Sequence, residues 1–380
     1  MAVANPSIST TAPVESEPGL WLRSRNWDLM FIMLSVIFVP LPYLVYLLGV
    51  QFGINPDVSR NVVNGFVAIA VGGPHMMSTF LRTGLDKDFN QRYPMLIRSS
   101  IIIPIIVVSL AFLNLQLLLT LFFFWAATHV LHQITYIVEL YNHKEHKYIR
   151  HSAVSLPARL IDYAVIMTCL FPFAAFKISQ GNFEVGTNNL TTVIPTVFQQ
   201  PWFVVVASVA FGAAFIAFLV KTYFEWRDQY INWPKTIFIL LTVAVAFVMP
   251  ALPNLDTAFQ GLNTWHSFQY LALTFYIIKI KETRGELDNS APMVARFSRQ
   301  NKDSRGLFIL STIMLVGSLV VFVVVYTAAA IIKPDIDPNV HFDTAYYTAI
   351  LSFLWIHYYH DHFLFTNFEA LDEAYGEAKT

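Results

Sequence analysis

Histidines and a few acidic residues lie inside segments of this sequence that are otherwise almost entirely apolar. On one such segment, His129, His132, Tyr136 and Glu139 follow one another at alternating spacings of three and four residues, which places them on one face of a helix. Imidazole and carboxylate groups bind metal ions and transfer protons. Because ionisable groups inside apolar helices are costly and usually functional, this stripe predicts a site with partners on other helices.

Two further motifs place a histidine inside an apolar segment. In the motif Gly72-Gly-Pro-His75, the proline removes a backbone donor and is expected to kink the helix. Such a kink is tolerated in lipid only where protein or a cavity covers it. His266 is followed one turn later by Gln269 and Tyr270, whose side chains are positioned to orient its imidazole. The structural alternative for His75 is a packing kink with a hydrogen-bonded histidine. For His266 it is a hydrogen-bonded histidine.

The last apolar segment carries the densest group of such side chains. His357, His360 and Asp361 lie within five residues and at helical spacing from His357. Asp361 is expected either to bind a metal or to hold a ligand histidine in place. For His129 and His132 on the first segment, the structural alternative is a polar seam that hydrogen-bonds neighbouring helices.

We predict that the histidines near the middle of these segments share one metal centre. The predicted metal ligands are His75, His129, His132, His266, His357 and His360, and the predicted catalytic side chains are Tyr136, Glu139 and Asp361. Glu139 is also open to two other roles, an outer ligand or an interfacial charge. Imidazole with carboxylate suits iron, zinc or copper, and the single cysteine, Cys169, leaves no thiolate site.

Composition identifies the class of protein. The chain has 380 residues, of which 56% are hydrophobic and only 13% are charged, whereas soluble domains carry roughly 25% charged residues. A membrane-spanning helix needs roughly 20 apolar residues, and we predict an all-α polytopic fold with about ten such helices. They are expected near Asp28–Val50, Asn61–Thr83, Leu96–Leu113, Gln116–Tyr141, Pro157–Phe176, Trp202–Val220, Lys235–Met249, Thr257–Ile280, Leu307–Ile332 and Asp343–Phe368.

The distribution of positive charge predicts the orientation. If the N-terminus is cytoplasmic, 21 of the 24 Lys and Arg residues fall on the inner side, and only Arg60, Lys177 and Lys333 fall outside. This bias follows the positive-inside rule and predicts cytoplasmic termini in a bacterial inner membrane or its equivalent. We expect a polar segment 1–27, one transmembrane domain 28–368 and an acidic cytoplasmic tail 369–380. The net charge of -1 gives no indication of a nucleic-acid partner.

The order of the motifs resembles that of the Brp/Blh-type membrane β-carotene dioxygenases. The shared features are a Gly-x-Pro-His helix, a later helix with a histidine, a Trp-His-Ser helix and a late His-containing helix followed by Asp. The matching positions here are Gly72–His75, His129 or His132, Trp265–Ser267, and His357 with Asp361. The resemblance implies a non-haem Fe(II) bound by histidines and oxygen chemistry on a long lipophilic substrate.

The leading hypothesis is a membrane-embedded non-haem iron oxygenase or hydroxylase, with one or two iron ions, that uses O2 on a lipophilic substrate. Its expected partners are the bilayer, that substrate and O2, with an electron-donor protein or a second copy of the chain left open. One alternative is a haem-binding electron carrier with opposed histidine ligands. The other is a transporter that uses the histidines as a proton or metal-ion path, although no internal repeat of the kind common in transporters is evident.

Overall fold

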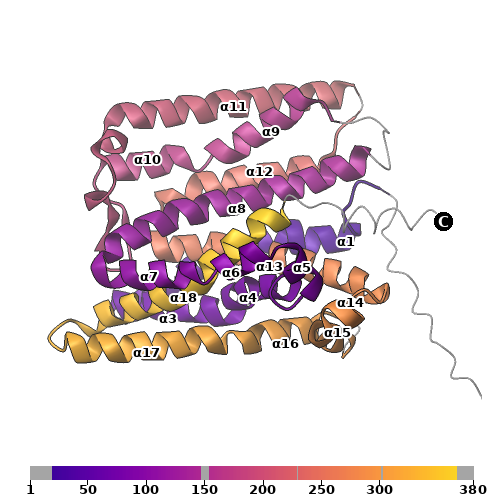
Figure 1. Cartoon of the computed structure of the whole chain (residues 1–380). Coiled ribbons are helices and arrows are strands. Elements are labelled where there is room, and N and C mark those ends of the chain that lie inside the picture. Colours follow the sequence, from indigo (N-terminus) through magenta and orange to yellow (C-terminus); the bar gives the residue numbers. More distant parts are fainter. Residues whose placement is uncertain (1–18, 147–153, 229, 301–302, 366–380) are drawn as a thin grey trace, which may run out of the picture.

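The computed structural model describes residues 19–146, 154–228, 230–300 and 303–365 (Figure 1). Within them the chain is helical apart from turns and one short antiparallel hairpin, β1 (Glu184–Val185) with β2 (Asn188–Asn189). The prediction of an all-α fold is therefore confirmed. Most of the predicted N-terminal segment and the whole acidic tail lie outside the described residues.

Helices occupy all ten segments that the sequence predicts to be helical. The first half of the chain forms α1 (Arg25–Trp27), η1 (Asp28–Met33), η2 (Leu34–Phe38), α2 (Leu41–Gln51), α3 (Pro56–Val67), η3 (Ala68–Gly72), α4 (Gly73–Arg82), α5 (Lys87–Arg92), α6 (Pro94–Ser99), α7 (Ile102–Leu113), α8 (Leu115–Glu145), α9 (Leu156–Thr168) and α10 (Phe171–Ser179). The second half forms η5 (Leu190–Thr192), η6 (Thr196–Gln199), α11 (Pro201–Arg227), α12 (Trp233–Val248), η7 (Met249–Ala251), α13 (Leu255–Thr283), α14 (Leu287–Ser290), α15 (Pro292–Arg299), α16 (Arg305–Met314), α17 (Val316–Ile332) and α18 (Pro338–Leu364).

Within the described residues, seven helical segments are long and apolar enough to cross a membrane, which indicates a membrane protein. They are Arg25–Gln51, Pro94–Leu113, Leu115–Glu145, Leu156–Ser179, Pro201–Arg227, Trp233–Ala251 and Arg305–Ile332. The other three predicted segments, α3 to α4, α13 and α18, are comparably long but carry more polar residues. Many of those residues are buried inside the bundle.

Asparagine and aspartate caps explain where several of these helices begin. The Asn114 side chain accepts a hydrogen bond from the Leu117 backbone amide and starts α8 directly after α7. Asn55 caps α3 and Asp337 caps α18, each followed by a proline at the first helical position. A side-chain acceptor satisfies the free amides of a helix start, and proline lacks the amide that would be left unpaired there.

The helices run alongside one another in layers (Figure 1). The helices α9, α10 and α11 lie along one side of the bundle, and α16 and α17 lie along the opposite side, where α17 packs against α18 and α16 against α4. The helices α8, α13, α18 and α4 lie between these sides. They carry the four histidines His129, His266, His357 and His75, all of which are buried.

The connection between α10 and α11 closes one end of the bundle. Its hairpin turn docks on α18, because the backbone amide and hydroxyl of Thr187 both donate to Asp343, at 2.9 and 3.0 Å. The same carboxylate pairs with the buried Arg60 of α3 at 3.0 Å. Arg60 also lies 3.8 Å from Asp256 at the start of α13. Arg60 thus joins α3, α13 and α18, and the loop is attached to them through Asp343.

Candidate metal centre

The helix that carries His75 is interrupted one turn before the histidine. Pro74 has no amide to donate, and the preceding turn η3 widens to a π-helix in which the Gly73 amide bonds to the Ala68 carbonyl. This accommodates the proline ring, which would otherwise clash with a carbonyl of the preceding turn. Gly73 also permits close packing, since a Cβ there would lie 2.7 Å from Leu315 of the turn between α16 and α17. The predicted kink is therefore present as a π-helical turn.

The helix that carries His266 is held on both sides by buried hydrogen bonds. The side chains of Trp265 and Gln269 each donate to the Ile32 carbonyl, at 3.1 Å. On the other side, Gln133 of α8 donates to the His266 carbonyl at 3.1 Å. These three bonds fix the rotation of α13, and with it the direction of the His266 side chain.

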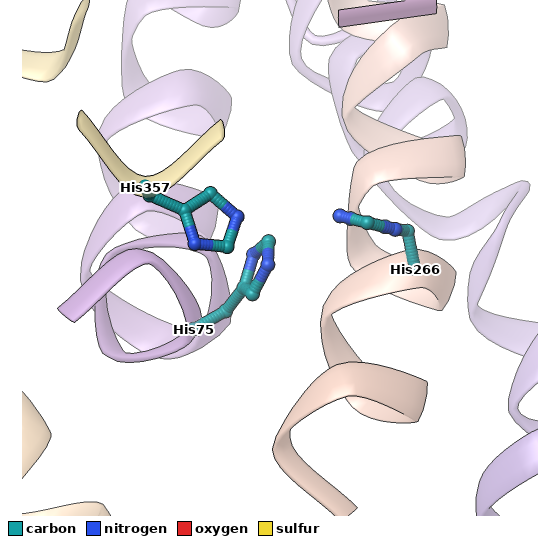
Figure 2. Close-up of side chains that lie close together, drawn as sticks. All are labelled: His75, His266 and His357. Atoms are coloured by element: carbon teal, nitrogen blue, oxygen red, sulfur yellow. The ribbon is translucent and has the colours of Figure 1, made fainter. Parts of the chain in front are cut away.

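Four imidazoles from four helices meet in the middle of the bundle. The ring centroids lie 4.7 Å apart for His75 and His266, 4.5 Å for His75 and His357, 5.2 Å for His129 and His266, and 5.0 Å for His129 and His357. Figure 2 shows three of these rings, contributed by three separate helices, facing a common space. Asp361, one turn after His357, completes what we call the histidine cluster: His75, His129, His266, His357 and Asp361.

Several polar atoms of the histidine cluster lack hydrogen-bond partners among the described residues. They are Nε2 of His75, His129 and His357, both ring nitrogens of His266, and Oδ2 of Asp361. All five residues are at most 5% exposed. Leaving a buried polar group unpaired costs about 1–3 kcal/mol, and buried polar groups are nearly always satisfied. So many unpaired atoms in one place indicate that the cluster accommodates something that supplies the missing bonds.

Hydroxyl groups set the orientation of two of the rings. Thr79 contacts Nδ1 of His357 and donates to Oδ1 of Asp361 at 3.0 Å, while the Tyr270 hydroxyl donates to the same oxygen at 2.6 Å. The Thr79 hydroxyl also lies 2.6 Å from the Tyr270 hydroxyl. Thr79 thus joins His357, Asp361 and Tyr270, while Nε2 of His357 has no partner among the described residues.

The His75 ring is fixed in the same manner. Its Nδ1 atom is hydrogen-bonded to the Ser267 hydroxyl at 2.9 Å, and Ser267 is fully buried on α13 beside His266. Holding one ring nitrogen by a hydrogen bond while the other faces an ion is the usual arrangement of metal-ligating histidines. Both His75 and His357 therefore present a prepared ligand nitrogen.

The spacing of these atoms fits a metal ion. The ligand atoms of His75, His266 and His357 lie within 4.8 Å of one another, and those of His129, His357 and Asp361 do so as well. Metal–nitrogen bonds of about 2.0–2.1 Å place opposite ligand atoms about 4 Å apart. Small side-chain rotations would bring ligand atoms that are up to 4.8 Å apart to this separation. The residues present therefore fit a bound ion.

Two predicted ligands do not join the cluster. His360 has both ring nitrogens hydrogen-bonded, Nδ1 to Thr83 at 3.0 Å and Nε2 to Ser100 at 2.8 Å, so neither nitrogen is available to a metal. His132 is only partly buried and packs against His362, with ring centroids 5.8 Å apart, near the described end of α18. His360 thus lies about one helical turn after His357, and His132 about one turn after His129. Only His357 and His129 belong to the cluster.

The predicted catalytic residues fall into different surroundings. Asp361 lies within the cluster. Tyr136 is buried and packs on Phe365, at 5.0 Å between ring centroids, and Phe365 in turn lies 5.8 Å from the His129 ring. Glu139 is instead engaged by Arg159, whose Nη2 atom lies 2.8 Å from its carboxylate. Of the roles that the sequence left open for Glu139, this ion pair fits that of an interfacial charge.

An interior cavity adjoins the cluster. It has a volume of about 50 Å³ and is lined mainly by aromatic and aliphatic side chains, with Met76 next to His75 and Tyr358 next to His357. The Tyr358 ring stacks on the His129 ring at 4.0 Å. Tyr358 therefore contacts both the cavity and the histidine cluster.

Comparisons with known proteins add no relative to this picture. No family model, no curated protein and no solved structure matches the chain. What this site does is therefore inferred from its own residues.

Proposed function

We propose that this protein is a membrane-embedded non-haem iron oxygenase or hydroxylase that oxidises a lipophilic substrate with O2. Its ligands are His75, His129, His266 and His357, with Asp361 as a further ligand or as their anionic partner. The observation that carries the proposal is the set of buried, unpaired ring nitrogens from four helices. Such atoms are costly to bury unless a bound ligand satisfies them, and one metal ion satisfies several imidazole nitrogens at once.

The chain's own residues would prepare the site and exclude water. Ser267 and Thr79 hold Nδ1 of His75 and of His357, which leaves the Nε2 atom of each ring for an ion. Tyr270 and Thr79 hold one oxygen of Asp361 and leave the other oriented toward His129 and His357, at 3.9 and 3.5 Å. Two histidines with one carboxylate form the ligand set typical of iron centres that react with O2, and reaction with O2 is the chemistry that bound iron would supply here.

The packing of the rings favours a bare ion over haem. The four imidazoles approach one another pairwise to about 5 Å around a common point. A haem between two opposed histidines requires the plane between them to be open for the macrocycle. Here the other two imidazoles occupy that space, and the adjoining cavity has a volume of only about 50 Å³.

We further propose that the bundle crosses the membrane ten times with both termini in the cytoplasm. The helices α13 and α18 have 29 and 27 residues, which at roughly 1.5 Å per residue exceeds the roughly 30 Å hydrocarbon core. Their polar residues face the interior, where the histidine cluster lies. Of the three cations assigned to the outer side, Arg60 is 2% exposed and paired with Asp343, so it adds little to the outer surface charge.

Elemental analysis of the purified protein tests the proposal. We expect about one iron per chain, bound by ligands that are all nitrogen or oxygen, with no Soret band in the optical spectrum. His129→Gln should remove the metal. The matched control, His132→Gln on the same helix, should retain it, because His132 lies outside the cluster.

A second pair of variants tests the ligand assignment independently, in case a variant of the first pair does not fold. His357→Gln should lose the metal, whereas His360→Gln should keep it, since both nitrogens of His360 are engaged by hydroxyl groups. Monodisperse elution and unchanged helical circular dichroism establish that each variant is folded. A folded His129→Gln or His357→Gln protein with full metal content would refute the ligand assignment, and a Soret band would refute non-haem iron.

A further inference from the structure

A groove on the membrane-facing side of the bundle lies between α3 and the pair α17 and α18. Its volume is about 350 Å³, and its lining is almost entirely apolar. On its rim, Ile69 and Leu319 are 65% and 59% exposed. In a membrane, such a surface faces the acyl chains of the bilayer.

The groove and the interior cavity share part of their lining. Ala68, Tyr346 and Ile350 line both spaces, so the two spaces adjoin the same three residues. From there the cavity continues to Met76 and Tyr358, the neighbours of His75 and His357. The groove and the cavity thus lie in sequence between the outer surface of the bundle and the residues next to the histidine cluster.

The cavity also contains a polar strip on α13. Gln260 and Asn263 both line it and are hydrogen-bonded to each other at 3.3 Å. Asn263 lies about one turn before His266 on α13, and Gln260 lies about one turn before Asn263. Amide groups of this kind bind hydroxyl or carbonyl groups. The neighbouring Asp256 is already compensated by Arg60 and Asn64, so the strip offers uncharged hydrogen-bonding groups.

We infer that the groove is the lateral entrance for a long-chain lipid with a small uncharged polar group, a hydroxyl or a carbonyl. The polar end enters the cavity and binds Gln260 and Asn263, while the rest of the chain stays in the groove. The cavity is several times larger than the roughly 10–15 Å³ that one water molecule needs, which suits one end of a chain. The carbons next to the polar group would then lie beside the histidine cluster.

This inference rests on the proposed function, because it names the substrate class and the path to the same site. Gly65 offers a clean way to block the path. It lines the groove, and a Cβ placed there meets nothing within 4 Å, so Gly65→Phe fills the groove without displacing protein atoms. Replacing a glycine inside a helix does not by itself weaken the helix. Gly212→Phe on α11, where a Cβ also meets nothing within 4 Å, is the matched control.

The experiment uses a long-chain primary alcohol that carries a diazirine beside its hydroxyl-bearing carbon. The purified full-length protein is irradiated with this probe in detergent, and the labelled residues are mapped by mass spectrometry. Leu351 and Phe123 line the cavity and are 0% and 5% exposed. We expect both to be labelled in the wild type and in Gly212→Phe, and labelled severalfold less in Gly65→Phe. A matched probe without the hydroxyl should label them less in every protein.

Each result decides between the two claims. Equal labelling of Leu351 in Gly65→Phe and Gly212→Phe, or no labelling of Leu351 in the wild type, would overturn the entrance. Equal labelling by the two probes would overturn the polar end of the substrate. The metal content of the same samples is measured in parallel: a wild type that holds no metal contradicts the proposed function whatever the labelling, and a metal-loaded wild type without cavity labelling contradicts the entrance alone.

Discussion

Two buried polar clusters in this bundle differ in whether their members are joined by ion pairs between lysine and carboxylate groups. The lysine cluster, which consists of Asp162, Lys221 and Lys235, joins α9, α11 and α12, with ammonium nitrogens 2.6 and 3.5 Å from the Asp162 carboxylate. Glu225 lies 3.3 Å from Lys221 and supplies a second carboxylate, so that two carboxylates face the two lysines. The histidine cluster has ring nitrogens that no group among the described residues satisfies.

The difference separates groups that hold helices together from groups that await a ligand. Breaking a buried ion pair leaves an uncompensated charge, so the lysine cluster is expected to govern stability. Removing one imidazole from the histidine cluster breaks no lysine–carboxylate pair, and Asp361 there keeps its bonds to Thr79 and Tyr270. Its loss is expected to appear in metal binding instead. The following predictions test this division, from the largest effect to the smallest.

The largest effect is expected in the lysine cluster. Asp162→Ala removes the carboxylate shared by two buried lysines and should lower the free energy of unfolding by about 3–5 kcal/mol, with metal content unchanged in the folded fraction. Thermal or denaturant unfolding in detergent measures the loss. Asp228→Ala is the control, because its pair with Arg227 is exposed and should change stability by about 0–1 kcal/mol. Normal stability with reduced metal content in Asp162→Ala would reverse the comparison.

A smaller effect is expected beside the histidine cluster. Thr79→Val removes the hydroxyl that contacts His357 and donates to Asp361. Loss of such a supporting bond typically weakens metal binding about 10–100-fold, which metal titration of the stripped protein measures. Thr83→Val, one turn later on the same helix, removes a hydroxyl that bonds only to His360 and to its own helix. If both variants bound metal equally weakly, general destabilisation of α4 would explain the result instead.

The smallest effect is expected at Glu139. Its partner Arg159 has a side chain that is 39% exposed, and such pairs contribute roughly 0–1 kcal/mol. Glu139→Gln should therefore shift the unfolding midpoint only slightly and leave the metal content intact. A marked loss of iron in this variant would restore Glu139 as an outer ligand.

The sequence alone predicted all ten helical segments because long apolar runs leave little choice of structure in a membrane. It also identified the four clustered histidines, but not which member of each close pair would face inward. His129 and His132, like His357 and His360, differ by about 60° around a helix axis. The direction of the interior is set by how the helices are rotated when they pack. That rotation depends on long-range contacts such as those of Ile32 with α13.

The supporting hydroxyls were harder to predict. Serine and threonine in apolar helices commonly bond to a carbonyl of their own helix, as Thr83 does with Thr79 here. Thr79 and Ser267 therefore carry no signal in the sequence that separates them from other hydroxyl residues. Their role emerges only once α4, α13 and α18 have been brought into contact.

The π-helical turn η3 has a consequence for how His75 is aimed. A π turn accommodates one residue more than the regular helix, so everything after Gly72 is turned by about 100° relative to an unbroken continuation of α3. Shortening Ala68–Gly72 by one residue would leave composition and hydropathy almost untouched. It would nonetheless swing the imidazole out of the bundle's centre, so the centre depends on the length of this five-residue segment as well as on its side chains.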